Sequence, residues 1–406
     1  NYMIEFFSPD NLFIPFPAVM VNHRNDKFLN QVHAFNRVLN DIFENDDINK
    51  NHVKESSVDL ILNDNTDTCL LFTAGPIDCK GSLEIEIDTP SKTYRTVAPL
   101  DVPRFGHKKI SLRESFNELP DGVKGIIKAK QPNQLLFYGR LISGQWRSDK
   151  TFSANHSYYD SSTTEEYWDN TEPSEGQYPF FSKFKSRIKI YPILSPSELE
   201  IILYANSNQG KEIFSQKVGK ITSPSNEFID IDVNTTFQNA EIDISTISSF
   251  GVRAQAINDS KIPTRIGHQL IYGAGGLDTS INILLENPNY FIPEGKKSMK
   301  WGQIIVGGGF DSFFGITADS KENKEITKHE ANITFYDKNG KLEERKVDIP
   351  NGTSLKFEAS KEFKEFTDYE KPQYIWCSIE SEKHGLNFFA CTYNTQTKHC
   401  SGDHGF

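Results

Sequence analysis

The sequence predicts an all-β protein: three tandem, diverged antiparallel β-sandwich repeats with one N-terminal amphipathic helix. Composition supports this, because 30 Phe and 15 Tyr accompany many Asn, Ser and Thr, whereas only 3 Met are present. A length of 406 residues exceeds one ordinary core, so several cores are expected. A strand–turn–strand pattern that occurs three times gives the number of repeats.

Each copy of this pattern combines a strand pair, a turn marked by proline and an alternating run that closes on phenylalanine. The three strand pairs begin at Leu83, Leu199 and Ala331. The three closing residues are Phe116, Phe237 and Phe363. They lie about 120 residues apart, the length of one sandwich domain. We therefore expect the segments near 60–160, 185–275 and 300–406 to share one topology, with the three phenylalanines as core anchors.

One N-terminal segment departs from the β pattern. Its apolar residues recur every three or four positions, which is typical of an amphipathic helix. These residues are Phe28, Val32, Phe35, Leu39 and Ile42.

Two polar stretches, 45–57 and 160–178, have the composition of linkers. The chain is therefore expected to divide into five parts. These are an N-terminal strand and helix packed on the first sandwich (1–57), the first sandwich (58–165), an acidic aromatic linker (166–182), the second sandwich (183–290) and the third sandwich (291–406).

Charge and composition exclude some partners. A net charge of −11 and a pI near 5.5 disfavour phosphate backbones, so no nucleic-acid partner is expected. No run approaches the roughly 18 apolar residues of a membrane span, and Asn1–Phe7 lacks the features of a signal peptide. Five cysteines are too few for a disulfide scaffold and favour the cytoplasm. Export stays open, with Cys69–Cys79 and Cys391–Cys400 as candidate pairs.

The main candidate site surrounds His156. Tyr158, Tyr159 and Asp160 follow it closely, so a base, two hydroxyls and a carboxylate stand together where a strand meets the acidic linker. The alternative is a strand end whose polar groups bond neighbouring backbone. If the protein binds a small molecule, we expect this cluster to line the site.

Two further sets of residues join the candidate list. Arg140 and Arg253 occupy matching places in apolar strands and need an anionic partner, either an acidic side chain of the same sandwich or a ligand. His268 matches His156, and His404 matches both more loosely. Convergence of the three histidines, with Asp403 or Asp160 as a fourth ligand, would make a metal site. No metal-binding spacing is present, so the sequence predicts no metal.

The expected function is that of a non-catalytic binding or assembly protein. Aromatic and acidic residues interleave between Tyr158 and Tyr178, a composition suited to gripping sugars, so a carbohydrate or a protein partner is expected. The alternative is a carbohydrate-active or metal-assisted enzyme around His156. Neither a nucleophile elbow nor a phosphate loop is present, so the sequence indicates no particular reaction and no cofactor. Whether the protein is an enzyme is left open.

Overall fold

The computed structural model describes most of the chain between residues 19 and 405. The described residues are 19–34, 36–38, 54–57, 60–74, 78–132, 137–139, 141–156, 158–159, 167–169, 171–193, 195–223, 225, 227–287, 298–319, 327–382 and 385–405. They divide into two compact bodies. We call them the N-terminal body, which spans 1–22 and 30–161, and the C-terminal body, which spans 23–29 and 162–406.

The described part of the N-terminal body contains antiparallel strands and one short helix. Its described elements, in chain order, are β1 (Val19–Arg24), β2 (Leu29–Ala34), β3 (Asn36–Val38), β4 (Lys54–Ser57), β5 (Thr66–Thr73), β6 (Cys79–Asp88), β7 (Thr93–Val102), β8 (His107–Ser111), α2 (Leu112–Ser115), β9 (Ile126–Lys130), β10 (Phe137–Gly139), β11 (Ile142–Arg147), β12 (Phe152–His156) and β13 (Tyr158–Tyr159). The tip of the β1–β2 hairpin, residues 23–29, belongs to the C-terminal body.

The C-terminal body is also antiparallel. Its described elements are β14 (Ser174–Pro179), β15 (Lys185–Ile190), β16 (Glu198–Ser207), β17 (Glu212–Thr222), β18 (Ile229–Asp232), α3 (Val233–Asn239), η1 (Ile244–Thr246), β19 (Ile247–Ala256), β20 (Gly267–Gly273), β21 (Ile281–Leu284), β22 (Ser298–Val306), β23 (Phe310–Ala318), β24 (Lys328–Asp337), β25 (Gly340–Pro350), β26 (Ser354–Glu358), α4 (Ala359–Glu362), η2 (Lys364–Phe366), β27 (Gln373–Ser381), β28 (Leu386–Asn394) and β29 (Cys400–His404). The all-β prediction is therefore confirmed.

Three sets of strands pair in the same order. The sheets are β13-β4-β9-β6-β7 with β12-β11-β5-β8, then β14-β19-β16-β17 with β18-β15-β20-β21, then β22-β27-β24-β25 with β26-β23-β28-β29. We number the strands of each set from one to eight in chain order, leaving out β10 and β13. In every set, one sheet then has the strand order one, six, three, four, and the other has the order five, two, seven, eight. The strand pairs that begin near Leu83, Leu199 and Ala331 are strands three and four of each set.

The paired sheets of each set enclose a core, because alternate residues along a strand point to opposite faces. In the N-terminal body, Leu70 and Phe72 of β5 meet Leu83 and Ile85 of β6. In the C-terminal body, β22 and β23 enclose another core. The five-part division of the chain proposed above stays a prediction.

The three closing phenylalanines follow strand five of each set. Each lies in or directly after a short helix: α2, α3 or α4. Phe116 is 6% exposed, Phe237 is fully buried and Phe363 is 2% exposed. Their prediction as buried residues is confirmed.

The second and third sets share one continuous aromatic core inside the C-terminal body. Tyr178 of β14 packs edge-on against Phe389 of β28, with ring centroids 5.4 Å apart. Phe184 likewise meets Phe313 at 5.1 Å. The Lys356 ammonium donates to two backbone carbonyls across this junction, at 3.0 Å each, and burial lowers its pKa.

Glycine is required where two turns of this junction meet. Gly210 has φ of +76°, and a Cβ there would lie 1.9 Å from the carbonyl oxygen of Asn351. A side chain at Gly210 is therefore excluded by both space and backbone conformation.

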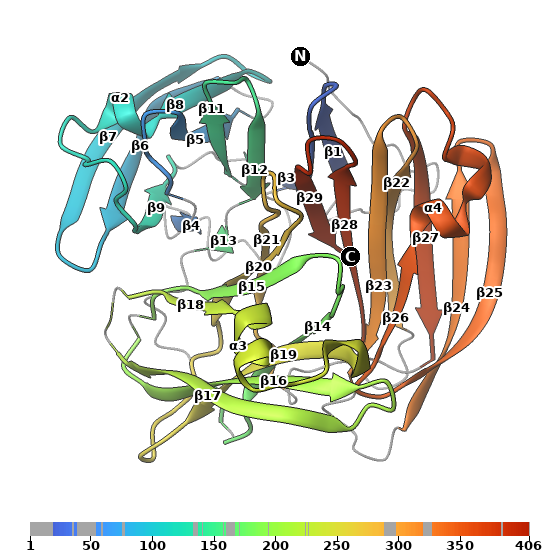
Figure 1. The fold of residues 1–406 in the computed structure, drawn as a ribbon. Helices are drawn as coiled ribbons and strands as arrows, with labels where there is room; N and C mark the ends of the chain where they lie inside the picture. Colours follow the sequence, from blue (N-terminus) through green and yellow to red (C-terminus); the bar gives the residue numbers. More distant parts are fainter. Residues whose placement is uncertain are drawn as a thin grey trace. The chain divides into compact units, whose positions relative to one another are not determined.

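The predicted N-terminal helix is wrong. Between residues 29 and 38 the structure has β2 and β3 in its place, and Figure 1 labels β3. Residues 28–33 are all buried, so both faces of β2 are covered, and a strand covered on both faces shows no alternation that could reveal it. Residues 39–42 of the predicted helix lie outside the described residues.

Part of the predicted linker is also a strand. Residues 174–179 form β14, in which Tyr178 is 1% exposed. The polar composition of this stretch concealed it, because the edge position of β14 tolerates Gly176 and Pro179.

Two long strands stand at sheet edges in the C-terminal body. β17 and β25 each have 11 residues and are mostly exposed. Figure 1 shows β25 at the outer end of its sheet. Both carry lysines, and the register of each against its neighbour shifts at an irregularity.

None of the described helices is long and apolar enough to cross a membrane. All five cysteines are described and buried, and none is in a disulfide.

A buried ion pair ties β6 to β9 in the N-terminal body. The Lys128 ammonium lies 2.8 Å from Asp88, and the Thr93 hydroxyl donates to Asp88 at 2.6 Å. Burial alone would raise the pKa of Asp88, but the bonds from Lys128 and Thr93 outweigh it and lower the pKa below the ordinary value of 3.8.

We predict that Phe237→Ala lowers the free energy of unfolding by about 3–5 kcal/mol, because the ring is fully buried and leaves a cavity. Urea unfolding measures this. Ile213→Ala, at an exposed site on β17, is the control and should change stability by less than about 0.5 kcal/mol. Equal effects of the two substitutions would contradict the anchor role.

We predict that Asp88→Asn destabilises the protein by about 2 kcal/mol at pH 7. Because the folded pKa is depressed, the stabilisation from the ionised carboxylate is fully present above pH 3.8 and is lost as the pH falls through the folded pKa. Unfolding curves at pH 7, 5 and 3 should show a constant difference from wild type between 7 and 5, and a smaller one at 3. A difference that is constant down to pH 3 would disprove the ion pair's contribution.

Candidate functional site

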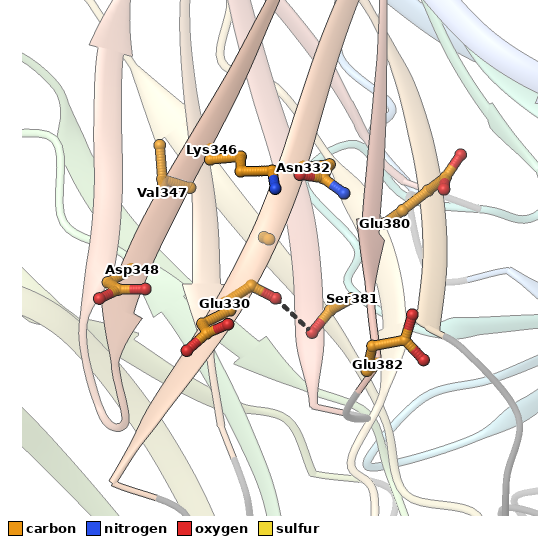
Figure 2. A pocket seen from close by; sticks show the side chains of 9 residues that line it. Glu330, Asn332, Lys346, Val347, Asp348, Glu380, Ser381 and Glu382 are labelled. Carbon is orange, nitrogen blue, oxygen red and sulfur yellow. Dashed lines mark hydrogen bonds between the residues drawn. The ribbon is translucent and has the colours of Figure 1, made fainter.

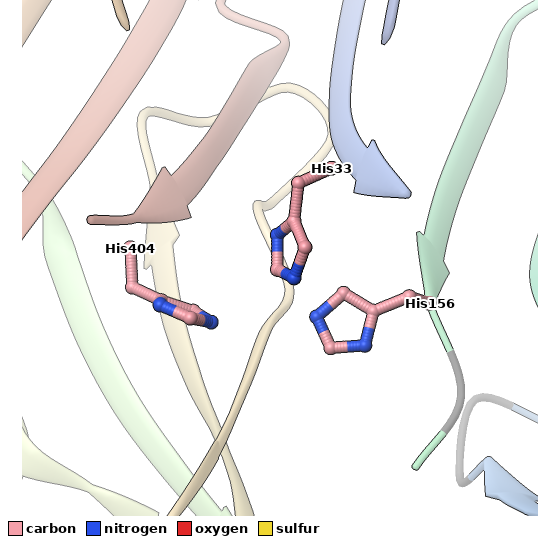
Figure 3. Close-up of side chains that lie close together, drawn as sticks. All are labelled: His33, His156 and His404. Carbon is pink, nitrogen blue, oxygen red and sulfur yellow. The ribbon is translucent and has the colours of Figure 1, made fainter. Parts of the chain in front are cut away.

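His156 ends β12 in the N-terminal body and is 1% exposed. Its ring lies beside that of His33 on β2, with centroids 4.1 Å apart and planes tilted by 54°. Figure 3 shows the two rings side by side. The figure also draws His404, which belongs to the C-terminal body. The sequence carries no signal that brings His33 near His156, because more than a hundred residues separate them.

β2 is fixed against β12 by a side chain. The amide oxygen of Asn30 accepts a hydrogen bond from the backbone N–H of Ala154 at 2.8 Å. The N–H of His156 donates to the side-chain oxygen of Asn155, also at 2.8 Å. The backbone of β12 before His156 is therefore held by two hydrogen bonds to asparagine side chains, one of them from β2.

The rest of the predicted cluster is only partly described. The backbone of Tyr158 and Tyr159 forms β13, which pairs with β4. Asp160 and Arg140 lie outside the described residues. A site that combines His156, Tyr158, Tyr159 and Asp160 stays a prediction.

Arg253 of β19 has acidic partners in its own sandwich. Its guanidinium lies 2.9 Å from Glu175 and 2.5 Å from Glu212, and it covers the ring of Tyr204 at 4.1 Å. Burial would lower the pKa of Arg253, but the bond to Glu212 and the charge of Glu175 outweigh it and raise the pKa above its ordinary value. Two partners were considered for this arginine, an acidic side chain of the same sandwich or a ligand. The structure pairs it with acidic side chains.

His268 of β20 is fully buried and bonds through Nε2 to the hydroxyl of Tyr178. Its ring packs at 5.6 Å from that of Tyr178. His268 thus lies in the aromatic core of the C-terminal body.

The matching of candidate residues between repeats is wrong in two places. His268 lies on strand seven of its set, whereas His156 and His404 lie on strand eight. Arg253 lies on strand six, but strand six of the first set is β9, well before Arg140. Unequal loop lengths caused both errors, because counting from the closing phenylalanine does not fix which later strand is reached.

A different surface carries aromatic and polar side chains together: the outer face of the sheet β22-β27-β24-β25. Ile375, Cys377 and Ile379 of β27 point into the core, so Trp376 and Ser378 between them point outward. We call this surface the outer face. Trp376 is flanked by Gln303 on β22 and Tyr336 on β24.

Two more cross-strand rows complete the outer face. One row is Trp301, Ser378 and Thr334, and the next is Met299, Glu380, Asn332 and Lys346. The rings of Trp301 and Trp376 lie 5.5 Å apart at 56°. Both tryptophans are half-buried, Tyr336 is 38% exposed and Met299 is 60% exposed.

A groove of about 470 Å³ continues the outer face (Figure 2). Side chains of Glu330, Asn332, Lys346, Asp348, Glu380 and Glu382 line it. Figure 2 shows the Ser381 hydroxyl donating to the backbone oxygen of Glu330, at 2.8 Å. Carboxylate, amide and ammonium groups here supply donors and acceptors beside the two tryptophans.

Sequence reasoning missed this face, although a signal was present. Because Trp376 alternates with apolar Ile375 and Cys377, the pattern already placed the tryptophan on the opposite face from the core.

We predict that Arg253→Met lowers stability by about 3 kcal/mol, because Glu175 and Glu212 lose their shared cation. Urea unfolding checks this. Lys217→Met is the control: Lys217 pairs with Glu200 at the surface, so a change below about 0.5 kcal/mol is expected. A stable Arg253→Met protein would return Arg253 to the list of ligand-binding candidates.

Comparisons with known proteins add little. No family model and no curated protein matches the sequence. A solved structure described as "Biofilm associated protein - BSP domain" aligns with 9% identity over 96% of this chain, with a TM-score of 0.16. The alignment covers 66% of that structure's chain, just under two thirds of its length. A TM-score this low supports no conclusion about the fold or the function of the chain.

Proposed function

We propose that the protein is a non-catalytic carbohydrate-binding protein and that the outer face binds an extended glycan. The observation that carries this proposal is the pair of half-buried rings Trp301 and Trp376, with the exposed side chains of Asn332, Glu380 and Lys346 in the adjacent cross-strand row. A sugar ring has an apolar face that stacks on aromatic rings and hydroxyls that need hydrogen-bond partners. The outer face offers both kinds of partner.

The layout of the outer face favours a polymer over a small molecule. The aromatic residues Trp301, Trp376 and Tyr336 lie on three neighbouring strands, β22, β27 and β24. Neighbouring strands of a sheet are about 4.8 Å apart. Asn332 and Glu380 form the next cross-strand row and lead into the groove. A chain of sugars crossing the strands would meet stacking surfaces first and hydrogen-bonding groups next.

A binding role fits this surface better than catalysis. The carboxylates of the groove lie on exposed strand residues, whereas a general acid for glycoside hydrolysis needs a raised pKa from an apolar setting. The enzyme alternative around His156 stays a separate hypothesis. It predicts release of reducing sugars when the protein is incubated with a glycan.

We predict that Trp376→Ala weakens glycan binding about tenfold, which corresponds to the loss of about 1.4 kcal/mol of stacking. Tryptophan fluorescence titration with soluble cellulose, xylan, mannan and chitin fragments measures this. Asn332→Ala should weaken binding about fivefold while leaving stability unchanged, because the side chain is exposed.

Trp146→Ala is the matched control. Trp146 is 41% exposed on β11 of the N-terminal body, where it packs on Phe152. Its replacement should leave glycan affinity unchanged. Absence of binding to every glycan in the panel would refute the carbohydrate proposal and leave a protein partner as the remaining occupant. Equal loss for Trp146→Ala and Trp376→Ala would place the ligand elsewhere.

A further inference from the structure

We propose that His33 and His156 form a binding site for a divalent transition-metal ion, of the zinc class, in the N-terminal body. The site uses different residues from the outer face, so it stands independently of the proposed function. It also departs from the sequence analysis, which predicted no metal and considered His156 only with His268 and His404.

The geometry of the pair supports metal binding. His33 is 2% exposed and His156 is 1% exposed, so water has little access to either ring. Their centroids are 4.1 Å apart, and a ring nitrogen of one lies within 4.8 Å of a ring nitrogen of the other. Two nitrogens bound to one tetrahedral zinc ion at about 2.0–2.1 Å are roughly 3.3 Å apart, so a small rotation of the side chains brings both into range.

The backbone holds the two histidines ready for a shared ion. The bond from the Ala154 N–H to Asn30 joins β2 to β12 two residues before His156 and three residues before His33. Both imidazoles thus extend from segments that this hydrogen bond joins, which reduces the entropy lost when a ligand binds.

The chemistry of the pair selects the metal class. Imidazole nitrogen suits Zn²⁺, Cu²⁺, Ni²⁺ and Co²⁺ and is a poor ligand for Ca²⁺ or Mg²⁺, which prefer oxygen. A neutral imidazole offers one nitrogen lone pair in the plane of its ring, and that lone pair is the ligand a metal ion binds. Two imidazoles fill two of the four positions of a tetrahedral ion, and we assign no others.

The test uses the full chain after treatment with a chelator. Equilibrium dialysis against Zn²⁺, followed by elemental analysis, should give one tightly held ion per chain. His33→Gln and His156→Gln should each weaken binding by at least tenfold, because each removes one of the two proposed ligands. His107→Gln is the matched control, since His107 is exposed on β8 of the same body, and it should bind as wild type does.

A second measurement keeps the proposal testable if the glutamine variants fold poorly. Zn²⁺ should raise the melting temperature of the wild-type protein and a chelator should reverse the rise, because an ion that binds only the folded state stabilises it. Wild-type protein that holds no Zn²⁺, Co²⁺ or Ni²⁺ after dialysis would overturn the proposal. Metal retained in full by the His33→Gln, His156→Gln double variant would overturn it equally, since the ion would then sit elsewhere.

Discussion

The aromatic core shared by the second and third strand sets is the constraint on which the C-terminal body depends. Tyr178 contacts Phe250 within its own set and Phe389 in the next, while its hydroxyl bonds His268. Edge-to-face rings interlock and resist sliding, because each ring edge fits only the face opposite it. The two sandwiches therefore cannot separate without exposing a large apolar surface, and they behave as one folded body.

This shared core also decides which surfaces are available for binding. The sheet β26-β23-β28-β29 of the third set faces the junction, where Phe313 of β23 meets Phe184. Its partner sheet, β22-β27-β24-β25, keeps an outer face with Tyr336 and Met299 exposed. The outer face thus lies on the sheet of the third set that does not pack against the second set.

The sequence predicted the fold class and the three buried phenylalanines because both depend on local patterns. Phe237 follows an alternating strand and sits in a short helix capped by Asp232, and all of this is readable within a few residues. The N-terminal segment failed for the opposite reason. Val32 and Phe28 are buried together with all the residues between them, and such continuous burial leaves no period of two.

The candidate site was harder to predict, because it depends on contacts between distant segments. His156 was selected for its neighbours in sequence, whereas its described ring neighbour is His33, more than a hundred residues earlier. Trp376 carried a local signal of outward orientation, but its proximity to Trp301 comes from the pairing of β27 with β22. No spacing rule in a single sequence encodes that pairing.

The edge strands have a consequence for how the protein behaves when crowded. β17 and β25 are long enough to template a neighbouring chain, since each presents a row of unpaired backbone groups on its open side. Lysines such as Lys217 and Lys346 project from them, and the irregularities at Ile201 and Phe335 break the flat register that stacking needs. Many copies can therefore lie close together without joining into cross-β fibrils.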